Sequence, residues 1–281
     1  MTPSRAPGLA LSTLIQAPLS RLRQSYKAMQ LSEETATTPG PAKKPRLYDG
    51  RFYVEQSAGS RRSAAAIAPL IFRMLNPRSI VDIGCGVGTW LAEFAALGVS
   101  DYLGIDGTYV PTGQLQIPPE KFLSTDLTKP HDLHRTYDLA MSLEVAEHLP
   151  ADRAESFVAF LTAAAPVVLF SAAVPGQGGT GHVNEQWPQY WRKLFRRRGY
   201  VPVDSIRPLI WGNSEIDWWY QQNIFLYCER DVFAARSGFA PVPETRSLDI
   251  VHPALYELYS NSGFRGALGL AMKALVRRVS A

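Results

Sequence analysis

The sequence has little cysteine, no long apolar run and no strong excess of either charge. Its 281 residues include two cysteines, Cys85 and Cys228, which are too few for a disulfide framework and fit no spacing of metal ligands. The longest apolar runs, near residues 161–174, are broken by Pro166 and are too short to span a bilayer. No cleavable signal peptide is recognisable. We therefore expect a protein of the reducing cytoplasm.

The low net charge limits which partners the composition indicates. The chain has 29 Lys and Arg residues against 25 Asp and Glu residues, a net charge of +4 at pH 7, much of it near the termini. A charge this mild does not by itself indicate a nucleic-acid partner, and the sequence contains no RNA-binding module. Hydrophobic residues make up 46% of the chain, which is enough for a substantial core.

The two ends of the chain differ in composition from the middle. Residues 1–46 are rich in Pro, Ser, Thr and Ala. We interpret them as a flexible segment, with a surface-binding helix and a targeting segment as alternatives. Residues 47–230 are expected to form the folded domain and residues 231–281 a helical extension. Its basic amphipathic stretch, 263–280, is expected to pack on the domain or on a second subunit, with peripheral membrane contact as the alternative.

The stretch SIVDIGCGVGTW, residues 79–90, combines a buried strand with a glycine-rich turn. Residues 79–83 are predicted to form the strand, and a helix is predicted to begin near Thr89. The glycines permit positive φ angles and place no Cβ atoms in the way, so a ligand can approach the backbone closely. The turn also faces a helix N-terminus, which favours negative or polar ligand groups. The stretch therefore predicts a nucleotide-type site at the carboxyl edge of a parallel sheet.

The spacing of the glycines separates two classes of nucleotide site. Dinucleotide-binding folds use G-x-G-x-x-G, whereas this turn reads G-x-G-x-G. The sequence Val-Asp-Ile-Gly-Cys-Gly-Val-Gly-Thr resembles the first motif of class I S-adenosylmethionine-dependent methyltransferases. An acid follows at the end of the next predicted strand, Asp106, where a carboxylate can accept both hydroxyls of a ribose. A NAD site and a glycine loop in an unrelated α/β domain are the alternatives.

The resemblance covers about residues 48–230 and implies a Rossmann-like α/β fold. The implied sheet has seven mostly parallel strands, helices on both faces and an antiparallel last strand. The pattern of apolar segments predicts strands at 79–83, 101–105, 121–125, 137–143, 167–170, 201–206 and 224–229, and helices at 64–75, 90–97, 151–165, 188–198 and 216–222. Ser60 or Ser63 is expected to cap the first of these helices.

The resemblance also implies which residues bind S-adenosyl-L-methionine. Asp126 is expected to accept the adenine amine and the backbone of Leu127 to serve the ring, although a capping role for Asp126 is the alternative. Tyr53 and Arg62 are expected over the methionine end, unless their helix only packs on the sheet. The full predicted set is Tyr53, Arg62, Asp82, Gly84, Cys85, Gly86, Gly88, Asp106, Gly107, Asp126, Leu127, Leu143 and Glu144.

Transfer of a methyl group to an alcohol requires removal of the alcohol's proton, by a base or with the help of a metal. His182, which follows the glycine-rich loop PGQGGTG, and His148 are the candidate bases. Glu185 is expected to orient His182, and Glu144 stands at the end of a predicted strand. The alternative is that His182 only closes the loop.

A metal site is a second interpretation of the same region. Glu144, Glu147 and His148, with His182 added, resemble the Glu-x-x-Glu-His metal site of small-RNA 2′-O-methyltransferases and ubiquinone-pathway O-methyltransferases. These ligands would suit Mg²⁺, Mn²⁺, Fe²⁺ or Zn²⁺. We favour a metal-free site, because Glu-His at this strand end also occurs in family members in which the glutamate only borders the cofactor.

Aromatic residues cluster late in the domain. Trp187, Trp211, Trp218 and Tyr220 are candidate walls of an acceptor pocket, whereas Trp191 is expected in the core. We predict an S-adenosylmethionine-dependent O-methyltransferase that acts on a small-molecule or sugar-containing acceptor rather than on nucleic acid. The alternatives are a metal-dependent RNA 2′-O-methyltransferase and a cofactor-binding scaffold protein without catalysis.

Overall fold

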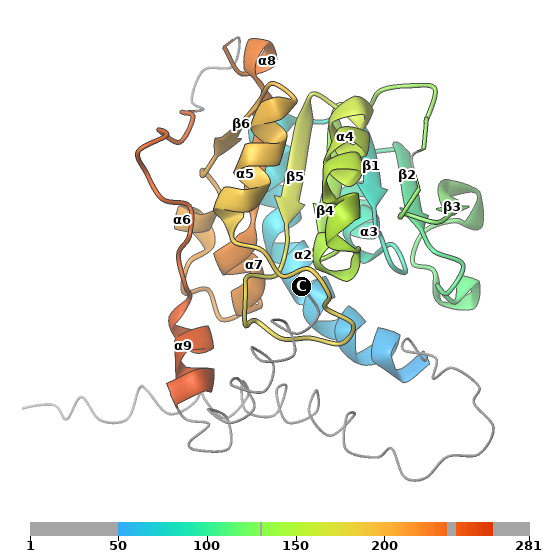
Figure 1. Cartoon of the computed structure of the whole chain (residues 1–281). Coiled ribbons are helices and arrows are strands. Elements are labelled where there is room, and N and C mark those ends of the chain that lie inside the picture. The colour runs from blue at the N-terminus through green and yellow to red at the C-terminus, as the bar shows by residue number, and fades with distance from the viewer. Residues whose placement is uncertain (1–49, 130, 235–239, 261–281) are drawn as a thin grey trace, which may run out of the picture. The chain divides into compact units, whose positions relative to one another are not determined.

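The computed structural model describes residues 50–129, 131–234 and 240–260, which form a seven-stranded sheet with helices on both faces (Figure 1). The strand order is β3-β2-β1-β4-β5-β7-β6. The strands are β1 Ser79–Ile83, β2 Asp101–Asp106, β3 Phe122–Ser124, β4 Leu139–Leu143, β5 Val167–Ser171, β6 Tyr200–Val203 and β7 Phe225–Glu229. The first five are parallel, and β7 runs antiparallel to both of its neighbours. The predicted fold class is confirmed.

The helices divide between the two faces of the sheet. Their bounds are α2 Gly50–Leu75, α3 Thr89–Ala96, α4 Ala154–Ala164, α5 Pro188–Arg197, α6 Arg207–Ile210, α7 Trp218–Asn223, α8 Arg230–Ala234 and α9 Pro253–Ser260. Helices α4 and α5 pack on one face, and α2 and α3 on the other (Figure 1). Alternation along the strands makes this possible: on β1, Val81 and Ile83 face the first layer while Ile80 faces the second.

The start of α2 differs from the prediction. Ser60 or Ser63 is the expected cap, but the helix begins at Gly50 and passes through both residues. The Ser63 hydroxyl instead accepts a hydrogen bond from the backbone N–H of Asp217, at 3.0 Å. A serine that satisfies a distant backbone group through tertiary packing gives the same local sequence signal as a cap.

Two other predicted helices differ from the observed ones by more than one residue at an end. The predicted helix 151–165 begins as a 3₁₀ turn, Ala151–Arg153, before α4, and the predicted helix 216–222 is α7, Trp218–Asn223. The predicted flexible segment 1–46 and the basic stretch 263–280 lie outside the described residues. Among the helices that the structure describes, none is both long and apolar enough to cross a membrane.

Two buried arginines hold residues 242–248 against the domain. Arg192 donates hydrogen bonds to the carbonyl oxygens of Val242 and Arg246, at 2.9 and 3.2 Å. Arg207 donates to the carbonyl of Leu248 at 3.2 Å and is paired with Asp204. These contacts fix the segment that precedes α9. Helix α9 itself packs against the loop that follows β5.

Candidate active site

The glycine turn after β1 leaves one open position on the backbone. Gly84, Gly86 and Gly88 all have positive φ, at 90°, 55° and 84°. A Cβ atom on Gly84 would lie 2.3 Å from Val145, and one on Gly88 would lie 2.8 Å from Ile117, so packing excludes a side chain at both. A Cβ atom on Gly86 would meet nothing within 4 Å. The backbone of Gly86 therefore faces space that a ligand can occupy.

Asp106 lies at the carboxyl end of β2, beside this open backbone. Its carboxylate is buried and accepts hydrogen bonds from the N–H groups of Gly86 and Gly107 and from the hydroxyl of Tyr109, each at 2.6 Å. Burial raises the pKa of Asp106, and these hydrogen bonds oppose the rise. The carboxylate is thus fixed next to the glycine turn, and Tyr109 is a contributor that the sequence did not indicate.

Asp82 on β1 and Cys85 in the turn are both buried. Burial, with a further contribution from the Asp106 charge, raises the pKa of Asp82 to about 8. Burial also raises the pKa of the Cys85 thiol, which keeps it protonated and unreactive. At neutral pH Asp82 is therefore protonated in most molecules, and its carboxyl group can donate as well as accept a hydrogen bond.

The other predicted cofactor residues occupy varied environments. Asp126 is exposed and accepts hydrogen bonds from the side chain and backbone of Thr128, which, with nearby Lys129, lower its pKa to about 2. Leu127 is buried in the core, and Arg62 lies 4.0 Å from Asp217. The backbone of Tyr53 lies in α2, but its side chain is outside the described part. The binding roles of these residues stay predictions.

Glu144 follows Leu143, the last residue of β4, and has a strained backbone. Its φ is 56°, in the left-handed region that residues other than glycine rarely adopt. Its carboxylate accepts hydrogen bonds from the amides of Gln177, at 2.8 Å, and Asn223, at 3.1 Å. Burial raises its pKa, against the effect of these hydrogen bonds. Strain of this kind is typical of functional sites.

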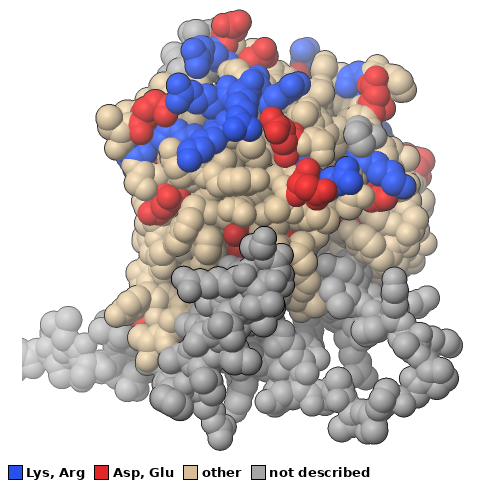
Figure 2. All heavy atoms as spheres, viewed as in Figure 1, with Lys and Arg blue, Asp and Glu red and all other residues tan. Residues whose placement is uncertain are grey.

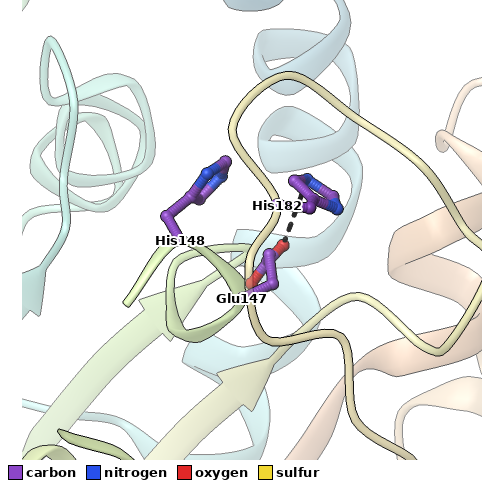
Figure 3. Close-up of side chains that lie close together, drawn as sticks. All are labelled: Glu147, His148 and His182. Atoms are coloured by element: carbon purple, nitrogen blue, oxygen red, sulfur yellow. Dashed lines mark ion pairs between the residues drawn. The ribbon is translucent and has the colours of Figure 1, made fainter. Parts of the chain in front are cut away.

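Glu147, His148 and His182 come together beyond this strand end, and we call them the Glu147 cluster (Figure 3). Glu147 and His148 lie in the 3₁₀ turn Ala146–His148. His182 Nε2 lies 4.0 Å from Glu147 Oε1, and the two imidazole rings are 4.8 Å apart at 86°. Burial and, to a smaller extent, the His182 charge lower the pKa of His148 to about 4. A hydrogen bond with the backbone of Gly181 opposes this decrease. His148 is therefore neutral at pH 7.

The Glu147 side chain is fully buried, and neither of its carboxylate oxygens has a hydrogen-bond partner among the described residues. Burial, followed by the Glu144 charge, raises the pKa of Glu147 well above its usual value. The backbone amides of Glu147 and Ala173 approach closely enough to oppose this rise, but not in hydrogen-bonding geometry. The structure thus presents a buried carboxylate whose acceptor capacity is unused.

Glu185, the residue expected to orient His182, lies beside its ring. His182 Nδ1 lies 3.2 Å from Glu185 Oε1. Glu185 accepts hydrogen bonds from the N–H groups of Gly176 and Gly178, both at 2.9 Å. The N–H of Val183 donates to the carbonyl of Glu147 at 2.9 Å. The 175–187 loop is therefore hydrogen-bonded to the turn that carries Glu147. This contact places His182 beside Glu147 and His148.

The aromatic candidates separate into exposed and buried residues. Trp187 and Trp211 are each 40% exposed, whereas Trp218 and Tyr220 are buried. Trp211 and Trp218 both contact the ring of His252, with ring centres 4.8 and 6.5 Å apart. Trp191 is in the core, as predicted. Gln177, Asn223 and His252 had no distinguishing sequence signal, because only the packing of the loops brings them to this edge.

Comparisons with known proteins place the chain among methyltransferases. A solved structure of a bacterial methyltransferase domain, CtHen1-CN, is 16% identical, covers 59% of this chain and 98% of its own, and has a TM-score of 0.44. Human N-acetylserotonin methyltransferase in complex with SAM is 14% identical, covers 75% of this chain and 66% of its own, and has a TM-score of 0.47. CalS10, an amino pentose methyltransferase from Micromonospora echinaspora, is 14% identical, covers 69% of this chain and 100% of its own, and has a TM-score of 0.48. No curated protein matches the chain. A family model described as a methyltransferase domain matches residues 56–220, more than half of the chain.

Proposed function

The chain belongs to this methyltransferase domain family, and we propose that it transfers a methyl group from S-adenosyl-L-methionine to a hydroxyl of a small-molecule or sugar-containing acceptor. The observation that carries the proposal is the position of two buried groups at the carboxyl edge of one sheet. Asp106 ends β2, and Glu147 and His148 of the Glu147 cluster follow β4. Since only β1 lies between these two strands, the proposed donor site and the proposed proton-accepting site are neighbours.

The residues around the glycine turn fit the donor. The open backbone at Gly86 and the oriented carboxylate of Asp106 suit a ribose with two hydroxyl donors. Asp126 and the backbone of Leu127 are assigned to the adenine, and Arg62 and Tyr53 to the methionine end. When bound, S-adenosyl-L-methionine supplies an activated methyl group, whose bond to sulfur breaks as its bond to the acceptor oxygen forms.

The protein's own chemistry is the positioning of the acceptor and the removal of its proton. Orientation of two reacting groups is worth roughly 7–11 kcal/mol. Glu185 lies at Nδ1 of His182, so the tautomer that donates from Nδ1 leaves Nε2 free to accept a proton. His148, neutral at pH 7, is the second imidazole within reach of the same space. We assign proton removal to His182, with Glu185 as its positioning residue.

The position of the basic surface formed by the described residues supports a small acceptor more than an RNA. Figure 2 shows Lys and Arg side chains gathered on the upper part of the molecule, whereas the carboxyl ends of the parallel strands point to the lower part in the same view (Figure 1). The exposed basic residues of α5 and its C-terminal end are Lys193, Arg196, Arg197 and Arg198, and Glu155 and Glu244 pair with two of them. This basic surface is not beside the proposed site.

The test is ligand-dependent thermal stability. S-adenosylhomocysteine is expected to raise the unfolding midpoint of the full chain, and Asp106→Ala is expected to abolish the rise. Asp152→Ala, which removes an exposed aspartate outside the site, is the matched control and should keep it. Stabilisation by NAD in place of S-adenosylhomocysteine, or by neither, would overturn the proposal. Release of S-adenosylhomocysteine from S-adenosyl-L-methionine with a panel of glycosides and phenols then distinguishes an enzyme from a scaffold.

A further inference from the structure

A hollow of about 270 Å³ lies between α6 and the segment that leads to α9, two parts of the chain that run next to each other (Figure 1). Its volume is close to the lower end of the range for small-molecule sites, which begins at about 300 Å³. The residues that line it are Asp204, Arg207, Pro208, Trp211, Arg246 and Ile250. None of them belongs to the glycine turn or to the Glu147 cluster, so a ligand in the hollow occupies a separate site.

One wall of the hollow is apolar and partly exposed to solvent. Trp211 is 40% exposed and Ile250 is 38% exposed, although most large apolar residues of the domain are buried. The ring of His252 lies against that of Trp211, with ring centres 4.8 Å apart. An indole held in this way beside a hollow offers a flat apolar surface on which another ring can stack. A ligand that fits this wall therefore has a flat or ring-shaped apolar face.

The charged groups of the hollow leave one guanidinium available. The buried Arg207 guanidinium donates two hydrogen bonds to Asp204, at 2.8 and 2.7 Å, and two more to backbone carbonyls. The Arg246 side chain is 56% exposed, and its guanidinium lies 3.6 Å from Asp204, which is too long for a hydrogen bond. It donates no hydrogen bond to any residue that the structure describes. Since Arg207 neutralises Asp204, the hollow carries a surplus positive charge at Arg246.

We propose that this hollow binds a small molecule whose ring carries a carboxylate. The ring stacks on Trp211, and the carboxylate accepts two parallel hydrogen bonds from the Arg246 guanidinium, whose planar shape matches it. The surplus charge attracts an anion and disfavours a cation. Benzoates and sugar acids share this chemistry, whereas a neutral ring lacks the group that Arg246 binds. This binding does not rest on the proposed function.

Hydrogen bonds connect the hollow to the acceptor half of the candidate active site through α7. Arg207 donates to the backbone carbonyl of Gln222 at 3.0 Å, and the N–H of His252 donates to the side chain of Gln222 at 2.7 Å. Gln222 donates to Asn223 at 2.9 Å, and Asn223 donates to Glu144 at 3.1 Å. A ligand in the hollow therefore fixes groups that hold α7. An effect of this ligand on methyl transfer, unlike its binding, rests on the proposed function.

The test is an NMR titration of the isotope-labelled full chain, followed through its indole N–H signals at constant ionic strength. The signal that is missing from the spectrum of Trp211→Phe identifies Trp211. The probes are benzoate and glucuronate, with benzamide and glucose as their neutral counterparts. We expect at least one carboxylate to shift the Trp211 signal saturably, and its neutral counterpart to bind at least tenfold more weakly. The tighter of the two carboxylates identifies the ligand as an aromatic acid or a sugar acid.

Two matched variants test the role of the guanidinium. Arg246→Gln should weaken binding of the carboxylate at least tenfold and leave the weak binding of the neutral counterpart unchanged. Arg197→Gln removes another exposed arginine, outside the hollow, and should leave both affinities unchanged. Equal affinity for a carboxylate and its neutral counterpart, equal affinity in Arg246→Gln and the parent chain, or no shift of the Trp211 signal would overturn the proposed site.

The two proposals fail separately. S-adenosylhomocysteine should stabilise Arg246→Gln as much as the parent chain, because Asp106 and Gly86 are untouched. Absence of that stabilisation in the parent chain refutes the proposed function and leaves the carboxylate titration valid. Absence of carboxylate binding alone refutes the site in the hollow and leaves the assignment of methyl transfer unchanged.

Discussion

The two halves of the carboxyl edge of the sheet differ in how their buried carboxylates are hydrogen-bonded. On the β1–β2 side, the Asp106 carboxylate accepts hydrogen bonds from two backbone N–H groups and one hydroxyl. On the β4–β5 side, the fully buried Glu147 carboxylate accepts none from the residues that the structure describes. Hydrogen bonds to charged groups contribute about 1.5–3 kcal/mol each, and a buried group left without one costs a similar amount. The carboxylate of the first half is therefore satisfied by hydrogen bonds within the protein, whereas that of the second half is not.

The comparison predicts opposite signs for two matched substitutions, and this is the largest effect expected. Asp106→Asn turns an amide group towards N–H donors and should lower the free energy of unfolding by about 1–3 kcal/mol. Glu147→Gln replaces a buried carboxyl group that accepts no hydrogen bond from the described residues, and it should raise the free energy of unfolding by about 1 kcal/mol at pH 8. Urea unfolding followed by tryptophan fluorescence measures both. Destabilisation of similar size in both variants would mean that the two halves are equally satisfied.

The difference between the halves also explains how much the sequence could predict. The sequence could place Gly84, Gly86, Gly88 and Asp106 at one edge of the sheet, because a strand, a tight turn and the next strand determine their positions locally. The predicted start of helix α2 was too late. Ser63 resembles a helix cap in the sequence, but its hydroxyl accepts a hydrogen bond from Asp217, which lies far away in the chain. Local pattern predicts what a segment needs for its own conformation, but not which distant group its polar atoms will meet.

The acceptor half was predicted in its residue types and not in its arrangement. Glu144, Glu147, His148 and His182 all stood out in the sequence. Their division into a glutamate held by two amides and a separate three-residue cluster depends on where the 175–187 loop and α7 pack. Since those contacts join segments far apart in the chain, no spacing rule could have predicted them.

The β1–β2 half should also show itself in the pH dependence of stability. The pKa of Asp82 is raised to about 8, so between about pH 4 and pH 8 the folded state holds a proton that the unfolded state releases. The free energy of unfolding should therefore fall as pH rises, by up to about 1.4 kcal/mol per unit. Asp82→Asn should remove this contribution, measured by urea unfolding at one-unit intervals.

An exposed aspartate provides the control for that slope. Hydrogen bonds from Thr128 lower the pKa of Asp126 to about 2, so its contribution to stability is present above pH 4 and is lost only as the pH falls towards 2. Asp126→Asn should therefore leave the slope between pH 5 and pH 8 unchanged. A parent chain whose slope matches that of Asp82→Asn would show that Asp82 is ionised throughout this range.

Tyr109→Phe is the smallest perturbation of the complete half. It removes one of the three donors to Asp106, while the ring that covers the Gly107 backbone stays. Stability should fall by about 1 kcal/mol. Affinity for S-adenosylhomocysteine, measured by calorimetry, should change less than tenfold, because two backbone N–H groups still orient the carboxylate towards the ribose. A loss as large as that caused by Asp106→Ala would make the Tyr109 hydroxyl itself a cofactor ligand. The N–H groups of Gly86 and Gly107 would then be insufficient to fix Asp106, and the β1–β2 half would depend on a side chain that the sequence did not reveal.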